Sequence, residues 1–182
     1  MFQKLAIPDV ILVTPKRHGD TRGFFSETYR ADAFAEAGIP GPFVQDNHAY
    51  SQQPGVLRGL HFQKPPHAQA KLVRCTQGAI YDVAVDIRQG SSTYGHYVGA
   101  KLSAENGAQL YVPEGFAHGY VTLTPDCHVQ YKTSDYYAPE AEGGLAWNDP
   151  ELGIEWPIEG LNVILSEKDK ILPSLSALAP IF

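Results

Sequence analysis

Short runs of alternating residues, separated by turn residues about every ten positions, constrain the fold of this chain more than any other feature. In residues 79–88, one face would carry Tyr81, Val83, Val85 and Ile87, and the other Ile80, Asp82, Ala84 and Asp86. A period of two is expected for a half-buried strand. Similar runs occur at 10–16, 43–49, 70–76, 96–102, 109–113, 118–123 and 128–133. This spacing predicts an antiparallel β-sandwich or barrel.

Helical signals are few. Residues 30–37 can form about two turns of helix, closed by Gly38 and followed by Pro40. The tail from Asp149 onward is rich in Pro, Leu and Ile, and we expect it to wrap the outside of the barrel. No repeat, low-complexity tract or long linker divides the chain. We therefore expect one all-β domain over residues 1–182, with residues 150–182 as its covering tail.

The charge balance is acidic, with 20 Asp and Glu against 14 Lys and Arg. General nucleic-acid binding needs clustered positive charge, so this class of function is disfavoured. Cys75 and Cys127 both fall in expected strands, which favours buried free thiols in a reducing compartment. The N-terminal residues lack a signal-peptide pattern, and no run approaches eighteen apolar residues. These features predict a cytoplasmic protein without a membrane segment.

The segment 55–63, Gly-Val-Leu-Arg-Gly-Leu-His-Phe-Gln, places Arg58 and His61 inside apolar sequence. Unpaired polar groups are costly to bury, so the segment is typical of a pocket wall that meets an anionic substrate. Simple alternation puts His61 and Arg58 on opposite faces of a strand. A bulge at Gly59 could re-aim one of them, or Arg58 could serve a neighbouring subunit. A purely structural histidine is the competing interpretation.

Four other side chains are candidates for proton-transfer chemistry. Lys71 shares a strand face with Val73 and Cys75, and it is either a surface lysine or a cation placed beside a developing enolate. Asp82 can pair with it. Tyr131 either fills the barrel or acts as a general acid. Asp169 lies in a polar island, 165–169, which is a surface turn unless its carboxylate orients the His61 imidazole.

The segment 107–118 ends in a Pro-Glu-Gly turn that delivers His118 to the start of a strand. It is similar to most of the second sequence motif of the cupin superfamily, whose fold is a jelly roll. The first cupin motif normally supplies two histidines and a glutamate for a metal. Here the equivalent stretch offers His61-Phe62-Gln63, with Lys71 further on and no acidic residue between Arg58 and Asp82. Catalytic metal sites usually take three protein ligands, so we expect no metal.

Together these segments resemble the dTDP-4-dehydrorhamnose 3,5-epimerase family of the cupin superfamily. The resemblance runs from Asp20 to Asp169 and rests on segments 20–27, 44–48, 55–63, 70–74, 78–88, 112–119, 147–150 and 165–169. It implies a cupin-type jelly roll, a double-stranded antiparallel β-sandwich with a few short helices. It also implies an isomerase of dTDP-L-rhamnose biosynthesis that needs no cofactor.

The resemblance implies a role for each candidate. His61 would be the base, Asp169 its orienting partner, Lys71 the stabiliser of the enolate and Tyr131 the acid on the opposite face. The positions expected to bind the sugar nucleotide are Arg22, Glu27, Gln45, Asp46, Asn47, Arg58, Lys71, His118, Glu142 and Lys168. The family is dimeric by strand exchange, which would place part of each site on the partner subunit.

Other functions stay open at this point. A relative could epimerise one carbon only or act on another 4-keto sugar nucleotide, with the same base and acid. Sugar-nucleotide ketoisomerases share the jelly roll, but the Tyr131 and Lys168-Asp169 matches favour epimerisation. A metal-dependent oxygenase is disfavoured by the missing ligands. A non-catalytic binding module would need the imidazole, phenol, lysine and carboxylate to coincide by accident.

Overall fold

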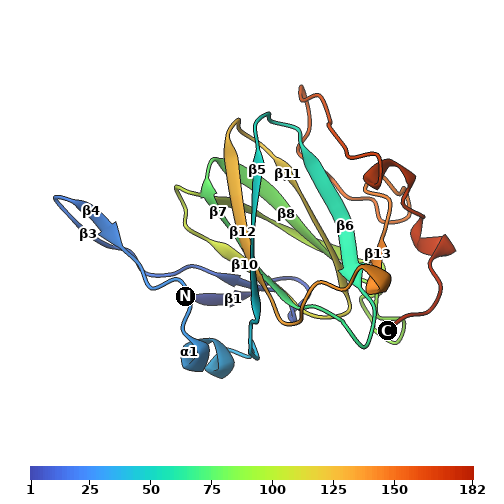
Figure 1. The fold of residues 1–182 in the computed structure, drawn as a ribbon, viewed down its shortest axis with the longest axis horizontal. Coiled ribbons are helices and arrows are strands. Elements are labelled where there is room, and N and C mark those ends of the chain that lie inside the picture. The colour runs from blue at the N-terminus through green and yellow to red at the C-terminus, as the bar shows by residue number, and fades with distance from the viewer.

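The computed structural model describes all residues, 1–182, and is built from two facing β-sheets (Figure 1). The strands are β1 Phe2–Lys4, β2 Ile11–Val13, β3 His18–Asp20, β4 Gly23–Phe25, β5 Gln45–Ser51, β6 Leu57–Gln63, β7 Lys71–Gln77, β8 Ala79–Asp86, β9 Tyr97–Ser103, β10 Gln109–Val112, β11 Phe116–Thr122, β12 Cys127–Thr133 and β13 Glu142–Gly144. The helices are α1 Ala31–Glu36 and the short 3-10 turns η1 Pro139–Ala141, η2 Asp169–Ile171 and η3 Leu175–Ala177. None of these helices is long and apolar enough to cross a membrane.

One sheet has six strands in the order β1-β2-β10-β7-β12-β5, and the other has five in the order β13-β6-β11-β8-β9. All the strand pairs within these two sheets are antiparallel. The jelly-roll sandwich with few helices, expected from the sequence, is therefore confirmed. Every strand expected from alternation is present within a few residues of its predicted bounds, whereas β1, β3, β4 and β13 were not predicted.

The space between the sheets holds the main apolar core. Val73, Leu110 and Val129 from the six-stranded sheet meet Ile80 and Leu102 from the five-stranded sheet. Cys75 and Cys127 lie in the same core as free, buried thiols, as expected. Burying this apolar surface supplies the main driving force that holds the two sheets together.

Strand β8 corrects one expectation, because it is buried on both faces rather than on one. Its Val83 and Val85 side chains point away from the sandwich, where Leu152, Trp156 and Leu175 of the C-terminal segment cover them. Figure 1 shows this segment, coloured orange to red, lying on the side of β6 and β13. Alternation predicted the two faces of β8 but not that the C-terminal segment, distant in sequence, covers the face away from the sandwich.

Helix α1 begins and ends close to the predicted residues and covers the outer face of the six-stranded sheet. Phe34 and Ile39 pack there against Leu72 and Tyr111. The helix ends because Gly38 adopts a φ of +86°, which continues no right-handed turn. An isolated helix of this length is not stable in water, so α1 depends on packing of its single apolar stripe against the sheet.

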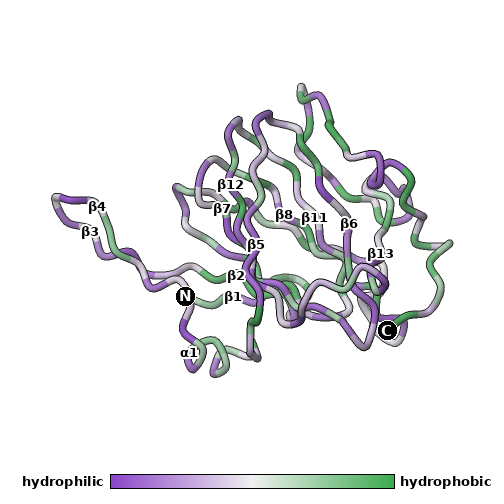
Figure 2. Tube along the Cα trace, viewed as in Figure 1, coloured by the Kyte–Doolittle hydropathy of each residue, from purple (hydrophilic) through white to green (hydrophobic).

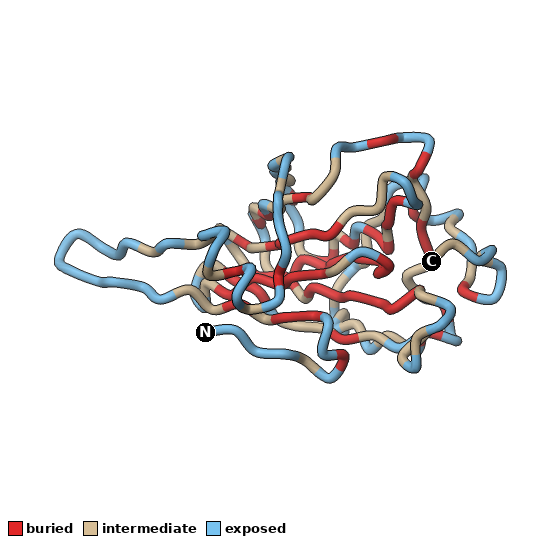
Figure 3. The backbone as a smooth tube through the Cα atoms, turned by 90° about the horizontal axis from the view of Figure 1, so that it is seen from below, coloured by how far each residue is buried: buried red, intermediate tan, exposed pale blue.

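The β3–β4 hairpin stands away from the body of the molecule. Figure 1 shows it projecting beyond the N-terminus, and Figure 3 shows it exposed along its length. Strand β4 of this hairpin nevertheless carries Phe24 and Phe25, with exposed fractions of 60% and 72%. Figure 2 shows the resulting hydrophobic stretch along β4. Apolar side chains of this size, exposed together on an extended arm, are typical of a surface that another chain covers.

Candidate active site

Two adjoining cavities lie between the sheets, with volumes of about 440 Å³ and 220 Å³. They share His61, Lys71 and Tyr131 as lining residues. His61 comes from β6 of the five-stranded sheet, while Lys71 and Tyr131 come from β7 and β12 of the six-stranded sheet. The side chains of two facing sheets normally interdigitate and fill the space between them, so cavities of this size mark a place where they leave room for a small molecule. The candidate groups therefore meet across one space rather than along one surface.

A bulge in β6 brings Arg58 and His61 to the same cavity. His61 pairs with His118 of β11, but Arg58 pairs with Tyr120, so two residues of β6, Gly59 and Leu60, lie opposite one residue of β11. Gly59 takes the extra position with a φ of +123°, which L side chains rarely adopt. The opposite orientation of Arg58 and His61 expected from simple alternation is thus wrong. The bulge at Gly59, considered as one alternative, is the reason.

His61 is held by a carboxylate from the C-terminal segment. Its Nε2 lies 2.6 Å from Oδ1 of Asp169, which is only 4% exposed. Nε2 is therefore the protonated nitrogen that donates to the carboxylate, and Nδ1 is left free to accept a proton. Burial lowers the pKa of His61, the Asp169 carboxylate opposes this, and Lys71 and Lys168 lower the pKa further. A neutral imidazole held in one tautomer is suited to act as a base.

Lys71 lies buried beside this imidazole. Its Nζ donates a hydrogen bond to the backbone oxygen of His61 at 3.2 Å. Burial lowers the pKa of Lys71 to about 8, although Asp82 and Glu142 act in the opposite direction. The ammonium group is therefore still charged at neutral pH, and it makes only this one hydrogen bond to the protein. A buried cation with donors to spare can stabilise a negative charge that develops on a bound molecule.

Tyr131 lines both cavities from the middle of β12, on the same face as Val129 and Thr133, as the sequence predicts. Burial raises the pKa of Tyr131, Arg58 opposes this, and Glu142 adds to the increase. The phenol therefore keeps its proton at neutral pH. Because Tyr131 and His61 belong to opposite sheets, a proton donor and a proton acceptor lie on opposite sides of the space.

His118 forms a buried pair with Asp82, and this corrects another expectation. His118 Nε2 lies 2.8 Å from Oδ1 of Asp82, whose side chain is fully buried. Asp82 was considered as a partner of Lys71, but no ion pair joins those two side chains in the structure. Asp82 Oδ1 is bonded instead to His118, which lies on β11, the hydrogen-bonded neighbour of β8 in the same sheet. His118 itself lines the larger cavity.

Four more predicted residues lie around these cavities. Gln45 and Asn47 line the smaller cavity from β5 and are hydrogen-bonded to each other at 2.9 Å. Glu142 lines the smaller cavity and Lys168 the larger one, and the two form an ion pair. Tyr137, which the sequence did not single out, donates its hydroxyl hydrogen to Glu142 at 3.3 Å. The rim is therefore a network of charged and amide groups.

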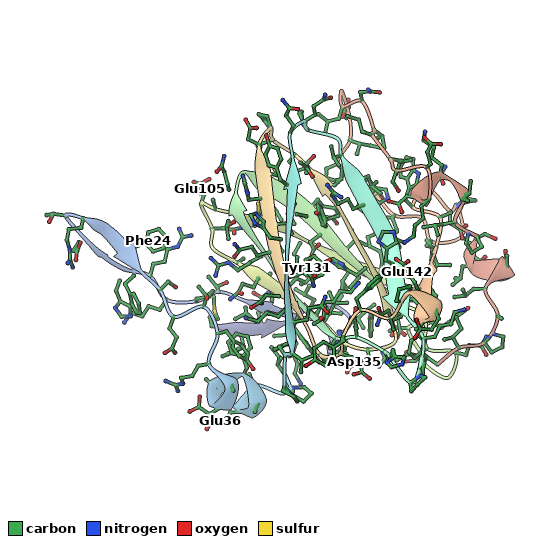
Figure 4. The ribbon with its side chains drawn as sticks, in the orientation of Figure 1. Phe24, Glu36, Glu105, Tyr131, Asp135 and Glu142 are labelled. Carbon is green, nitrogen blue, oxygen red and sulfur yellow. The ribbon has the colours of Figure 1, made fainter.

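Three predicted residues lie elsewhere. Asp46 alternates with Gln45 and Asn47, so it points to the outer face of β5, where it pairs with Lys132 at 2.9 Å. The Arg22 side chain is 88% exposed on the projecting hairpin and pairs with Asp20. Glu27 follows this hairpin and is also exposed, next to Arg30. Figure 4 shows how far the hairpin residue Phe24 lies from Tyr131. One chain by itself does not bring these three residues to the cavities.

Tyr120 is another cavity residue that sequence reasoning missed. It lines the larger cavity from β11, two residues after His118 and on the same strand face. The period of two that placed His118 at the site could have found it. In the sequence it stands among Gly, Val and Thr, where a tyrosine most often serves only for packing.

A metal ion needs several donor side chains grouped around it. No three or more His, Cys, Asp or Glu side chains are grouped so that they could hold one. The two histidines of the cavity are each already bound to a carboxylate, Asp169 or Asp82. The absence of a metal from the reaction stays a prediction.

Comparison with known proteins identifies the family. The family model for dTDP-4-dehydrorhamnose 3,5-epimerase matches residues 4–177. The dTDP-4-dehydrorhamnose 3,5-epimerase of Sinorhizobium fredii is 52% identical over 177 residues, which are 97% of this chain and 90% of that protein. The chain belongs to the dTDP-4-dehydrorhamnose 3,5-epimerase family.

The solved structures of this epimerase family agree with the fold. An epimerase from Legionella pneumophila, crystallised in complex with dTDP-4-keto-L-rhamnose, has a TM-score of 0.93 and 44% identity. The match covers 98% of this chain and 94% of that one. A more distant relative, the dTDP-4-dehydrorhamnose 3-epimerase of Streptomyces niveus, is 42% identical over 86% of this chain and 75% of its own length. The family thus includes proteins named for one carbon as well as for two.

Proposed function

We propose that this protein is an isomerase that converts dTDP-4-dehydro-6-deoxy-D-glucose to dTDP-4-dehydro-L-rhamnose by epimerisation at C3 and C5, in dTDP-L-rhamnose biosynthesis. One observation carries the proposal: an imidazole and a phenol line the same cavities from opposite sheets, together with a buried lysine. Inversion of a carbon centre needs removal of a proton from one side and its return on the other. His61 and Tyr131 offer this arrangement.

The chemistry follows from the C4 ketone, which acidifies the hydrogens on both neighbouring carbons. Nδ1 of His61 takes a proton, the C–H electron pair forms a C=C bond, and the carbonyl electrons move onto O4. The Lys71 ammonium stabilises this enolate oxygen. The Tyr131 hydroxyl then returns a proton to the other face of the carbon. The ketone itself serves as the electron sink, so we propose that no cofactor takes part.

Asp169 keeps His61 in this tautomer throughout. A buried carboxylate at 2.6 Å also stabilises the imidazolium that forms when His61 accepts the proton. We assign Arg58, Lys168, Gln45, Asn47, Glu142 and His118 to binding of the sugar nucleotide. Arg58 and Lys168 are the cations at the cavity suited to a diphosphate.

We further propose that residues 1–182 form one domain with one site, and that the active unit is a homodimer of such chains. The exposed hairpin, with Phe24 and Phe25 near Arg22 and Glu27, supports this assembly. It would carry Arg22 and Glu27 to the partner subunit's cavity. Light scattering would measure the mass, and Arg22→Ala should raise KM without changing kcat. A monomer with normal activity would contradict this arrangement.

A second candidate is epimerisation at C3 alone, and the similarity to the Streptomyces niveus 3-epimerase favours keeping it. Incubation with dTDP-4-dehydro-6-deoxy-D-glucose in deuterated water separates the two. Proton NMR should show deuterium entering both C3 and C5. Exchange at C3 only would establish the single-carbon reaction, and exchange at neither carbon would refute the proposed activity.

A further inference from the structure

One buried side chain at the smaller cavity takes no part in the proton transfers. Gln63 is the last residue of β6, two positions after His61, and it is only 5% exposed. Its side chain lines the smaller cavity. Buried amide groups are almost always hydrogen-bonded, because an unmatched polar group keeps its full desolvation penalty. The partners of Gln63 therefore show which parts of the chain it holds in place.

The amide group of Gln63 joins the segment that follows β6 to the segment that precedes β13. Its Nε2 donates to the backbone oxygen of His67 at 2.7 Å and to that of Tyr136 at 3.1 Å. Its Oε1 accepts a hydrogen bond from the backbone N–H of Ala138 at 2.9 Å. Only one orientation of the amide satisfies all three bonds, because carbonyl oxygens need its N–H groups and an N–H needs its oxygen.

The two bonds to the second segment lie on either side of Tyr137. This segment connects β12 to β13, and Figure 4 labels residues near its two ends, Asp135 and Glu142. The backbone N–H of Tyr137 itself donates to Oε1 of Gln45 at 3.1 Å. Two glutamine side chains therefore hold the backbone of three consecutive residues, 136–138.

The side chain of Tyr137 depends on this support. It lines the smaller cavity, but the residue is 56% exposed, so packing in the core does not fix its ring. Its hydroxyl group makes one hydrogen bond, a donation to Glu142 at 3.3 Å. A tyrosine side chain turns about only two bonds, so the position of its ring follows closely from the position of its backbone.

We propose that Gln63 is a positioning residue for substrate binding, which fixes the backbone of Tyr137 so that its ring is ordered at the smaller cavity before substrate arrives. The inference rests on the proposed function, in which the cavities bind a sugar nucleotide. A side chain that is already ordered loses little conformational entropy on binding, and this strengthens binding. None of the three bonds of Gln63 goes to His61, Lys71 or Tyr131 side chains, so the proton transfers should be unaffected.

Gln63→Met removes the amide group and keeps nearly the same length and volume. We expect it to raise KM for dTDP-4-dehydro-6-deoxy-D-glucose about tenfold, equivalent to about 1.4 kcal/mol, with kcat unchanged. Asn106→Leu is the matched control, because Asn106 also makes three side-chain hydrogen bonds to the backbone, in the turn between β9 and β10. Asn106 lines neither cavity, so this variant should lose stability and keep the KM of the parent protein.

A double-mutant cycle shows whether Gln63 acts through Tyr137. Tyr137→Ala alone should raise KM, and Gln63→Met should change KM no further when it is added to Tyr137→Ala. Gln63→Asn serves the same purpose if the methionine variant folds poorly, because it keeps a polar amide in the buried site. Its amide is one methylene too short to bridge both segments, so KM should rise in this variant as well.

Amide hydrogen exchange tests the contact without substrate. Gln63→Met frees the N–H of Ala138 directly, so exchange at Ala138 is expected to be faster whatever the role of Gln63. The N–H of Tyr137 is bonded to Gln45 instead. It should exchange about tenfold faster in Gln63→Met, because the whole segment is then held less firmly.

Each other outcome overturns the inference. An unchanged KM, or an unchanged exchange rate at Tyr137, would show that Gln63 does not position this residue for binding. A rise in KM that persists in the Tyr137→Ala background would mean that Gln63 contacts the substrate itself. Equal rises in Gln63→Met and Asn106→Leu would indicate a general loss of stability. If the parent protein epimerises no dTDP sugar, the proposed function fails, and hydrogen exchange still decides whether Gln63 holds Tyr137.

Discussion

The bulge at Gly59 should be the least replaceable backbone position of the site. An alanine there would place its Cβ 2.6 Å from Cα of Gly119 and 2.8 Å from the backbone oxygen of His118. Non-bonded carbon atoms pack at about 3.5–4.0 Å, so β6 and β11 would have to separate locally by about 1 Å. Overpacking costs about 1–3 kcal/mol. The φ of +123° adds about 1–3 kcal/mol for a residue with a side chain.

We therefore expect Gly59→Ala to lower the free energy of unfolding by about 4 kcal/mol. In a domain of this size 1 kcal/mol corresponds to about 2–4 °C, so Tm should fall by roughly 12 °C. The same displacement moves His61 relative to Asp169 and Lys71. A misplacement of about 1 Å can reduce turnover about a hundredfold.

Gly160→Ala is the matched control. Gly160 also has a positive φ, +74°, but no atom lies within 4 Å of its added Cβ. It should lose only about 1–2 kcal/mol, because it carries the backbone strain without the clash. Urea unfolding and thermal melts of both variants, with kcat for each, make the comparison. Equal losses in the two variants would refute the argument that close packing of β6 on β11 fixes the site.

Four further predictions concern the chemistry. His61→Ala should abolish deuterium exchange at both carbons while dTDP binding is largely kept, and turnover retained in this variant would remove His61 from the mechanism. Asp169→Asn should lower kcat by a factor on the order of 10²–10⁴ with little change in KM, since an amide cannot hold the imidazole in the required tautomer; full activity would contradict the dyad. Because burial lowers the pKa of Lys71 to about 8, kcat should fall as pH rises through about 8. Between about pH 8 and the ordinary lysine pKa of 10.5, Lys71 binds more protons in the unfolded chain than in the folded protein. Its contribution to the free energy of unfolding should therefore rise with pH over this range. Urea unfolding at several pH values tests this sign. EDTA should leave the activity unchanged, and a loss that zinc or iron restores would count against cofactor-free catalysis.

Local pattern was enough to predict much of the framework. Strands β7 and β12 lie where alternation placed them, and Lys71 and Tyr131 point inward with Val73 and Val129 as predicted. The period of two is a property of the extended backbone itself, so it can be read before any partner strand is known. The helix that ends before Gly38 follows from an equally local cause.

Predictions from alternation were wrong where two backbones lie in close contact. The direction of Arg58 depends on the extra residue in β6, which depends on how closely β11 approaches Gly59. The partner of Asp82 depends on which strand is its neighbour, and that strand lies 36 residues away in sequence. Neither fact is encoded in the residues next to Arg58 or Asp82.

By itself the sequence determined the all-β class, the inward faces of most strands and, through its motifs, the family. Only the tertiary structure placed the two sheets so that His61 and Tyr131 face each other, and set Asp169 against an imidazole 108 residues away. It alone showed the hydrogen bonds of Gln63 on either side of Tyr137 and the hairpin that carries Arg22 away from its own cavity. The physical reason is that strand periodicity is local, whereas pairing, burial and the meeting of charges depend on which distant segments the folded chain brings into contact.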